Sequence, residues 1–182
     1  TEENGFDFAP VLQGVDYKSG VGGGICQVSS TLYNVVLRSG LTPLERKSHS
    51  LPLSYVEPGM DATIYGDTID LKFKNSFNYP ICIESYIKDK ELFINFYSNN
   101  ELNNKEYVLE SDVYDVEPAK IKIINDKNLA SGKTVIERKG SDGYWVMVTR
   151  KTYEKGELTD SEIISDDYYK AVDTVVRKGI GN

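Results

Sequence analysis

The sequence predicts an α+β fold in which one Cys-bearing helix packs on an antiparallel sheet, followed by a smaller, elongated all-β module. Three observations lead to this prediction. Residues 25–39 carry apolar side chains at helical spacing, whereas most later segments alternate apolar and polar residues as strands do. A polar, turn-rich stretch at residues 98–105 divides the chain. We therefore expect two domains, residues 1–104 and residues 105–182, each with its own core.

The predicted helix follows a cluster of three glycines and ends at Gly40, a residue typical of helix C-termini. Pro43 prevents the helix from continuing. The apolar stripe of this helix consists of Val28, Leu32, Val35 and Val36. Because each residue turns the helix by about 100°, the opposite face carries Cys26, Ser30, Tyr33 and Leu37.

Strands are predicted on both sides of the polar stretch. Before it, two strands flank a turn at Gly66, and a hairpin with one buried face follows; these strands are residues 61–65, 70–74, 81–87 and 92–96. After it, we expect strands at residues 120–124, 134–138 and 144–152. No helix start is found after residue 105, so the second domain is predicted to be all-β.

Composition excludes several classes of protein. The chain has 182 residues, of which 40% are apolar and 27% charged, which is typical of globular proteins. The net charge of -7 is spread over both halves, and no run of five basic residues is present, so we expect no nucleic-acid partner. Apolar stretches are too short to span a membrane. Because the chain opens on Thr1 rather than Met, we interpret it as a fragment of a longer protein. We expect a monomer that is attached to a membrane only through a missing N-terminal anchor.

Cys26 is the first candidate for chemistry. It lies in the first turn of the predicted helix, where backbone N–H groups and the helix dipole lower the pKa of a thiol and so favour the nucleophilic thiolate. The N–H groups from Gly24 to Cys26 are placed to form an oxyanion hole. The alternative is a small buried hydrophobe. Helical phase argues against that alternative, because Cys26 faces away from the apolar stripe.

His49 is the only histidine, and a cysteine nucleophile usually needs an imidazole base. Its polar flanks argue against a core position, and the alternative is a surface histidine without a role. Asp61 is placed to orient the imidazole as the third member of a triad, with Asp67 and Asp70 as competing candidates. A turn-capping aspartate is the alternative interpretation of Asp61.

The second cysteine, Cys82, lies in an alternating segment and is interpreted as a structural thiol. A Cys26–Cys82 disulfide remains open as an alternative. A metal site built from both cysteines with His49 and Asp61 lacks any short-range pair of ligands. We therefore expect neither a metal nor a cofactor.

Several motifs resemble the signature of the VanW family. They are GGGICQVSSTLYN at residues 22–34, ERKSHSLP at 45–52, YVEPGMDAT at 55–63 and DLKFKN at 70–75. The resemblance extends over about residues 5–98. The family often has two histidines in its second motif, and Lys47 stands in place of the first, so His49 alone can carry a base role. The second half is similar to the G5 domain of cell-surface proteins, with matches at 137–140, 143–153, 156, 164–165, 168 and 179.

The VanW resemblance implies an L,D-transpeptidase that forms 3–3 cross-links in peptidoglycan through a cysteine acyl-enzyme, or a carboxypeptidase where water is the acceptor. Stem peptides and glycan would be the partners, outside the cytoplasm in the cell wall or on the membrane of a Gram-positive bacterium. The alternative is a non-catalytic peptidoglycan-binding or glycan-binding protein linked to glycopeptide resistance. Expected contacts to the oxyanion and substrate come from Gly23, Gly24, Gln27, Ser30, Arg46 and Ser48.

Overall fold

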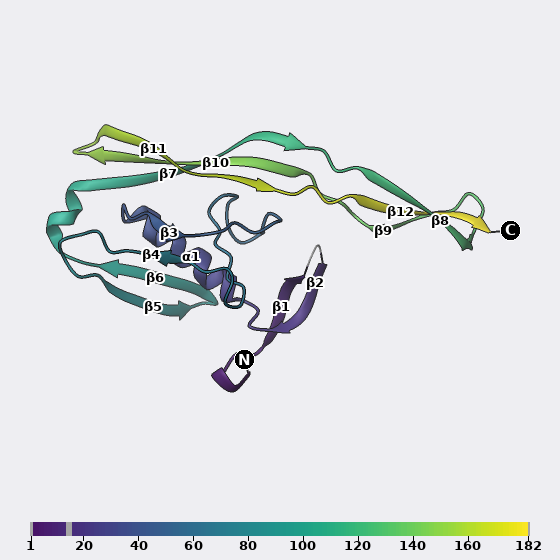
Figure 1. Cartoon of the computed structure of the whole chain (residues 1–182), viewed down its shortest axis with the longest axis horizontal. Coiled ribbons are helices and arrows are strands. Elements are labelled where there is room, and N and C mark those ends of the chain that lie inside the picture. The colour runs from purple at the N-terminus through teal and green to yellow at the C-terminus, as the bar shows by residue number, and fades with distance from the viewer. Residues whose placement is uncertain (1, 14–15, 182) are drawn as a thin grey trace.

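The computed structural model describes residues 2–13 and 16–181. Within these ranges the chain forms mostly β-strands, arranged in several small sheets around one α-helix (Figure 1). The coarse prediction of a strand-rich chain with one helix is therefore confirmed. No helix in the described ranges is long and apolar enough to cross a membrane.

Helix α1 spans Ile25–Arg38, one residue shorter than predicted. Gly24 precedes it with φ 98°, a left-handed conformation that favours glycine, and Gly40 ends it with φ 81°. Gly40 is also needed for space, because a Cβ there would collide with the ring of Tyr107. The helix lies against strands β6 (Glu91–Tyr97) and β7 (Lys105–Glu117).

The buried face of α1 differs from the predicted stripe, which is a correction. Val28 is 49% exposed, and of the predicted stripe only Val36 is fully buried. The buried residues of the helix are Ser29, Ser30, Tyr33, Val36 and Leu37. The physical reason is a neighbouring loop, residues 60–64, whose backbone runs along this face and forms hydrogen bonds to serine hydroxyls. Small hydroxyl side chains therefore serve here as packing surface.

The strands of the N-terminal region (residues 2–104) pair as three hairpin-like units. Strand β1 (Phe8–Gln13) pairs with β2 (Asp16–Val21), β3 (Pro43–Glu45) with β4 (Lys72–Phe73), and β5 (Cys82–Lys88) with β6, all antiparallel. The predicted β5–β6 hairpin is therefore confirmed. Its single buried face is not, because every residue of β5 is exposed and only β6 lies against the helix.

The predicted strand at residues 61–65 does not form. Its backbone instead pairs with side chains of α1 and with Lys47, whose carbonyl accepts from Thr63 N–H at 2.8 Å. The predicted strand at 70–74 shortens to Lys72–Phe73. An irregular segment thus lies where the sequence alternation favoured a hairpin.

The C-terminal module (residues 105–181) contains two three-stranded sheets in succession (Figure 1). The proximal sheet, beside the helix, has the order β11-β10-β7, with β10 spanning Gly143–Glu154 and β11 Glu157–Tyr169. The distal sheet has the order β8-β12-β9, formed by Ile121–Ala130, Thr174–Gly181 and Thr134–Arg138. Strand β12 runs parallel to β8 and antiparallel to β9. The prediction of an elongated all-β module is confirmed for the described residues.

The proximal sheet and the N-terminal region share one core. Tyr33, Leu37 and Ala62 form a buried cluster, against which Leu109 of β7 and Ile164 of β11 pack. The guanidinium of Arg150, on β10, donates hydrogen bonds to two helix-end carbonyls, Leu37 O at 3.1 Å and Leu41 O at 2.6 Å. The expectation that each half has its own separate core is therefore wrong at this junction.

Candidate active site

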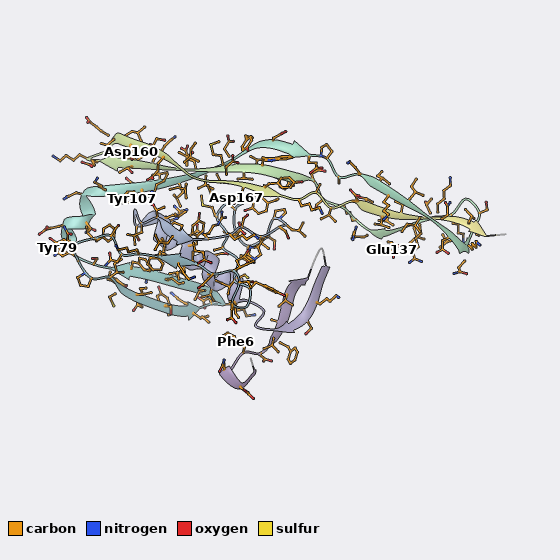
Figure 2. The ribbon with its side chains drawn as sticks, viewed as in Figure 1. Phe6, Tyr79, Tyr107, Glu137, Asp160 and Asp167 are labelled. Atoms are coloured by element: carbon orange, nitrogen blue, oxygen red, sulfur yellow. The ribbon has the colours of Figure 1, made fainter. Side chains whose placement is uncertain are left out.

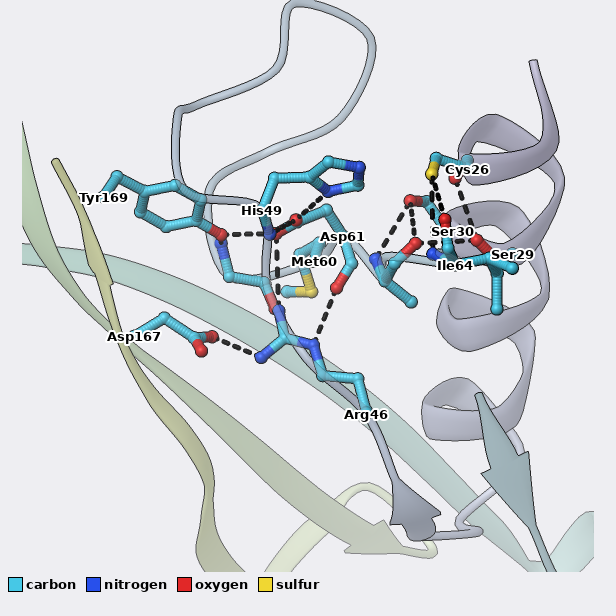
Figure 3. A network of polar contacts seen from close by, with 12 residues as sticks. Cys26, Ser29, Ser30, Arg46, His49, Met60, Asp61, Ile64, Asp167 and Tyr169 are labelled. Atoms are coloured by element: carbon cyan, nitrogen blue, oxygen red, sulfur yellow. Dashed lines mark hydrogen bonds and ion pairs between the residues drawn. The ribbon is translucent and has the colours of Figure 1, made fainter. Parts of the chain in front are cut away.

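The structure brings the three predicted catalytic residues to one site, where the start of helix α1 meets the irregular loop (Figure 3). Cys26 is the second residue of α1 and is half-buried. His49 and Asp61 lie on the chain between β3 and β4, and their exposed fractions are 8% and 1%. The inference from its polar flanks that His49 lies outside the core is therefore wrong, and so is the alternative of a surface histidine.

The thiol of Cys26 contacts the backbone of Ile64. Ile64 N–H donates to Sγ at 3.5 Å, and Sγ lies 3.6 Å from Ile64 O. Burial by itself raises the pKa of Cys26, but the imidazole of His49 and the Ile64 N–H outweigh it and hold that pKa below its ordinary value. The site therefore favours a thiolate.

The amides at the start of α1 supply a donor beside this thiol. Ile25 N–H donates to Gly22 O, and the N–H groups of Gln27 and Val28 donate to Gly24 O. Within the described ranges the N–H of Cys26 has no acceptor. It is thus available to an oxygen that approaches the thiol, in the positive field of the helix N-terminus.

His49 is held by Asp61 through two hydrogen bonds to the same oxygen. Asp61 Oδ2 lies 2.6 Å from His49 Nδ1 and accepts from the His49 backbone N–H at 2.6 Å. Burial lowers the pKa of His49, but hydrogen bonding to Asp61 and to Cys26 dominates and raises it to about 9. At neutral pH the imidazole is therefore protonated, as a partner for a thiolate must be.

Asp61 remains ionised although it is buried. Burial raises its pKa, but hydrogen bonds from His49 and Tyr169 and the charge of Arg46 lower it below the ordinary value. Its second oxygen, Oδ1, accepts from the Tyr169 hydroxyl and from Arg46 Nη2, the latter at 3.3 Å. The competing candidates Asp67 and Asp70 are exposed. Asp61 is the aspartate that contacts His49.

Arg46 does not have the role expected from the sequence, which is a correction. Its Nε donates to Asp61 O at 2.7 Å, Nη1 to Asp167 Oδ2 at 2.5 Å and Nη2 to Gly59 O at 3.0 Å. The guanidinium lies over the ring of Tyr33, and the side chain is only 6% exposed. Its internal partners occupy all three nitrogens, so Arg46 braces Asp61 rather than binding a substrate carboxylate.

The other expected contact residues divide into two groups. Gly24 and Gln27 are exposed beside Cys26, and Ser48 is half-buried next to His49. Ser30 is buried, and its hydroxyl accepts from Ala62 N–H at 3.0 Å, so it is a packing residue and not a substrate contact. Gly23 is required by space, because a Cβ there would collide with Ala9.

Sequence analysis missed the contribution of the C-terminal module to this network. Tyr169 and Asp167 lie at the end of β11, more than 100 positions from Asp61. Nothing in their local sequence signals a site, since both occur in an alternating strand. Cys82, interpreted from the sequence as a structural thiol, is exposed. Both cysteines are free, so the alternative disulfide is not formed.

Comparison with known proteins gives both halves a family. The model described as "VanW like protein" matches residues 1–97, and the G5 domain model matches residues 109–180. A protein from Bacillus subtilis (strain 168), printed as "Uncharacterized protein YoaR", is 41% identical over 105 residues, which are 58% of this chain and 35% of the relative. The chain thus matches about a third of that relative's length.

Two solved G5 domains are among the structures to which this chain is similar. The G5 domain of an IgA1 protease has a TM-score of 0.31 and 20% identity, covering 43% of this chain and 94% of that one. HP0197-G5 has a TM-score of 0.25 and 21% identity, covering 41% of this chain and 99% of that one. Because the VanW-like model matches more than half of the residues and the G5 model follows it directly, the chain belongs to the VanW-like family and carries a G5 domain behind its VanW-like domain.

Proposed function

We propose that the chain is a cysteine-dependent acyltransferase that acts on peptidoglycan as an L,D-transpeptidase. A VanW-like domain followed by a G5 domain indicates a cell-wall-associated protein. The observation that carries the finer proposal is the grouping of Cys26, His49 and Asp61 at one site. The thiol pKa is lowered, the imidazole pKa is raised, and a buried carboxylate contacts that imidazole. This is the charge pattern of a thiolate nucleophile and its acid–base partner.

The first half-reaction is cleavage of a stem peptide. Cys26 Sγ attacks the carbonyl carbon of the third residue, and the resulting oxyanion is stabilised by the Cys26 N–H. Collapse of this intermediate breaks the bond to the terminal D-alanine, whose nitrogen takes the proton of the His49 imidazolium. The products are a thioester on Cys26, free D-alanine and neutral His49.

The second half-reaction transfers the acyl group. An amine of a neighbouring stem attacks the thioester, and His49 takes the proton that this amine loses. The amide bond of a 3–3 cross-link forms, the thiolate leaves, and the imidazolium is restored. With water as the acceptor, the same steps release a shortened stem peptide, which is carboxypeptidase activity.

Acyl-enzyme formation tests this proposal directly. The intact chain is incubated with a tetrapeptide stem, and its mass is expected to rise by the mass of the tetrapeptide minus the mass of the released D-alanine. Cys26→Ala should abolish the adduct, whereas Cys82→Ala, which removes the other free thiol, should leave it unchanged. Muropeptides from cells that express the native and the Cys26→Ala chains should differ in 3–3 cross-links. Identical patterns together with an absent adduct would contradict the proposal.

A second candidate is non-catalytic binding of wall glycan by the C-terminal module, outside the cytoplasm. A hollow of about 330 Å³ lies between the two sheets and is lined by Glu117, Lys120, Arg138, Tyr168, Lys170 and Asp173, among others. Tyr168 also packs against Trp145, with ring centroids 4.4 Å apart. Aromatic rings beside charged groups suit a sugar chain. Tyr168→Ala should weaken co-sedimentation with purified cell wall without changing the reactivity of Cys26.

A further inference from the structure

Two side chains of the C-terminal module reach the network around Asp61. Tyr169 is the last residue of β11 and is buried; its hydroxyl donates to Asp61 Oδ1 and accepts from Gly59 N–H at 2.6 Å (Figure 3). Asp167 lies two residues earlier, so it shares the same face of the strand, and it pairs with Arg46 at 2.5 Å. Both contacts cross from the G5 domain to the VanW-like domain.

These contacts account for the orientation of the Asp61 carboxylate. Oδ2 accepts both hydrogen bonds from His49, and Oδ1 accepts from Tyr169 and, at 3.3 Å, from Arg46. With one oxygen held from each side, the carboxylate plane cannot turn away from Nδ1. Tyr169 is the partner that fixes the side facing away from His49.

Arg46 gives the same strand a second hold on Asp61. Its Nε binds Asp61 O, and its Nη1 is paired with Asp167. The backbone adds a third contact: Lys170 N–H donates at 2.8 Å to the carbonyl oxygen of Ser50, the residue that follows His49. The end of β11 is therefore seated along residues 46–61 through two side chains and the main chain.

We propose that Tyr169 and Asp167 are positioning residues of the Cys26 site, so that the site is complete only when strand β11 of the G5 domain is seated on it. Their catalytic relevance rests on the proposed function, since they act through Asp61 and His49 and not on a substrate. The G5 domain would then have a part in the chemistry besides any contact with the wall. Tyr169 holds the carboxylate, and Asp167 holds the guanidinium that braces it.

The measurable consequence is the ionisation of His49. The charged and titratable groups around it are Cys26 from α1, Asp61 and Arg46 from the loop and β3 side, and Tyr169 and Asp167 from β11. Without the Tyr169 hydroxyl, Asp61 Oδ1 loses this hydrogen bond, and the carboxylate is free to rotate. The Oδ2–Nδ1 hydrogen bond, which keeps the imidazole protonated, then weakens. The His49 pKa should therefore fall toward that of an ordinary histidine.

His49 is the sole histidine, so its imidazole signals in a proton NMR titration of the full chain are unambiguous. We expect Tyr169→Phe to lower the His49 pKa by about 1, within the range by which a charged, hydrogen-bonded partner shifts a pKa. Tyr168→Phe is the matched control, because Tyr168 is the exposed neighbour on the same strand and bonds to Glu117. It should leave the titration unchanged. Asp167→Asn, which keeps the shape of the side chain, should lower the pKa by a smaller amount.

A His49 pKa that is unchanged in both Tyr169→Phe and Asp167→Asn would overturn the positioning role. A raised pKa would also overturn it, because Tyr169 would then merely withdraw charge from Asp61. The acyl-enzyme assay separates this inference from the proposed function. A lowered pKa in a chain whose native form makes no acyl-enzyme supports the positioning role and defeats the transpeptidase. Acylation with the native pH profile in both variants supports the transpeptidase and defeats the positioning role.

Discussion

Both sheets of the C-terminal module contain strands in which apolar and polar residues alternate, but the surroundings of the two sheets differ. In the proximal sheet, alternate residues of β10 are buried because they face the helix and the loop before β4: Val146, Val148, Arg150 and Thr152. In the distal sheet, nearly all residues of β8 and β9 are exposed, including apolar ones such as Ile123 and Ile136. Figure 2 shows the side chains of the distal sheet projecting on both sides of a thin ribbon. Alternation alone therefore does not produce a core; a facing layer does.

The difference extends to the polar groups. At the proximal sheet, the buried Arg150 and the half-buried Asp167 bind partners in the VanW-like domain. In the distal sheet, Arg177 pairs with Glu137 and Asp126 within the same sheet, and its side chain is 45% exposed. Charged side chains of the proximal sheet therefore bridge the two domains, whereas those of the distal sheet pair within that sheet on its surface. Variants that remove matched groups from the two sheets test this comparison.

The largest effect is expected from removing the proximal sheet. A chain that ends at Lys105 loses β7, β10 and β11, and with them Leu109 and Ile164 of the shared core. It should aggregate or unfold without a cooperative transition, because the helix face and the buried Asp61 become exposed. A chain that lacks only the distal strands, with a short glycine–serine linker in place of residues 119–141 and an end at residue 172, should melt cooperatively. Thermal unfolding followed by circular dichroism compares the two chains.

Equal melting of the two truncated chains would contradict the shared core. It would place the stability of the VanW-like domain in its own hairpins, as the sequence prediction of separate cores has it.

The next effect is expected from the buried arginine of the proximal sheet. Arg150→Met removes the donors to Leu37 O, Leu41 O and Thr42 Oγ1. Leu37 O keeps the N–H of Gly40, whereas the carbonyl of the buried Leu41 loses its donor, and so does the carboxylate of Glu162. We expect a loss of about 3 kcal/mol in the free energy of unfolding, typical of breaking a buried charged network. Arg177→Met in the distal sheet should cost less than about 1 kcal/mol, because exposed ion pairs contribute little. Urea denaturation measures both, and equal losses would contradict the proposed difference between the sheets.

The same comparison explains which parts of the structure were predictable from sequence. The helix ends were predictable, because Gly24 and Gly40 signal them through local backbone conformation. The contact between His49 and Asp61 was also predictable, because an aspartate was expected to orient the imidazole. Their catalytic roles remain a proposal. Local signals sufficed wherever the feature depends on a few adjacent residues.

Features that depend on distant contacts were not predictable. Apolar and polar residues alternate over residues 61–65 as they do in a strand. The backbone of this segment nevertheless forms hydrogen bonds with serine side chains of α1, and it does not pair with a neighbouring strand. Arg46 was expected to contact a substrate, because its partners Asp167 and Gly59 are not adjacent to it in the sequence. Tyr169 gave no signal at all, since a tyrosine at a strand end is ordinary. In each case the local sequence does not reveal which distant part of the chain packs against the residue.

A smaller effect is expected from apolar side chains. Val148 is fully buried against Gly59, where a Cβ would collide with it, and Val148→Ala should cost about 2 kcal/mol through lost burial and a cavity. Ile123→Ala in the distal sheet removes a larger side chain that is 61% exposed, and it should change stability by less than about 0.5 kcal/mol. Urea denaturation again provides the measurement. A larger cost for Ile123 would show that something covers the distal sheet in solution.

The smallest effect in the native chain concerns the pH dependence of stability, because two shifts at the buried site oppose each other. The raised pKa of His49 contributes stability that is present below its unfolded value and is lost as pH rises through about 9. The lowered pKa of Cys26 contributes stability that is gained as pH rises through its folded value toward its unfolded value. Between the ordinary pKa values of histidine and cysteine, about 6.5 and 8.5, the unfolded pair holds one proton, on Cys26. A folded pair in which Cys26 is already a thiolate also holds one proton, on His49. The proton counts are equal, so this pair should give a flat profile.

Cys26→Ser breaks this balance and should reveal the contribution of His49. Serine does not ionise in this range, so only the histidine shift due to Asp61 remains, and the free energy of unfolding should fall as pH rises above about 6.5. Cys82→Ser is the matched control and should keep the flat profile, since Cys82 is exposed and lies outside the site. High salt in both samples screens exposed pairs such as Arg177 with Glu137, so that the remaining slope comes from the buried network. A native chain that loses stability steadily over the same range would mean that Cys26 stays protonated, and the thiolate–imidazolium pair would have to be abandoned.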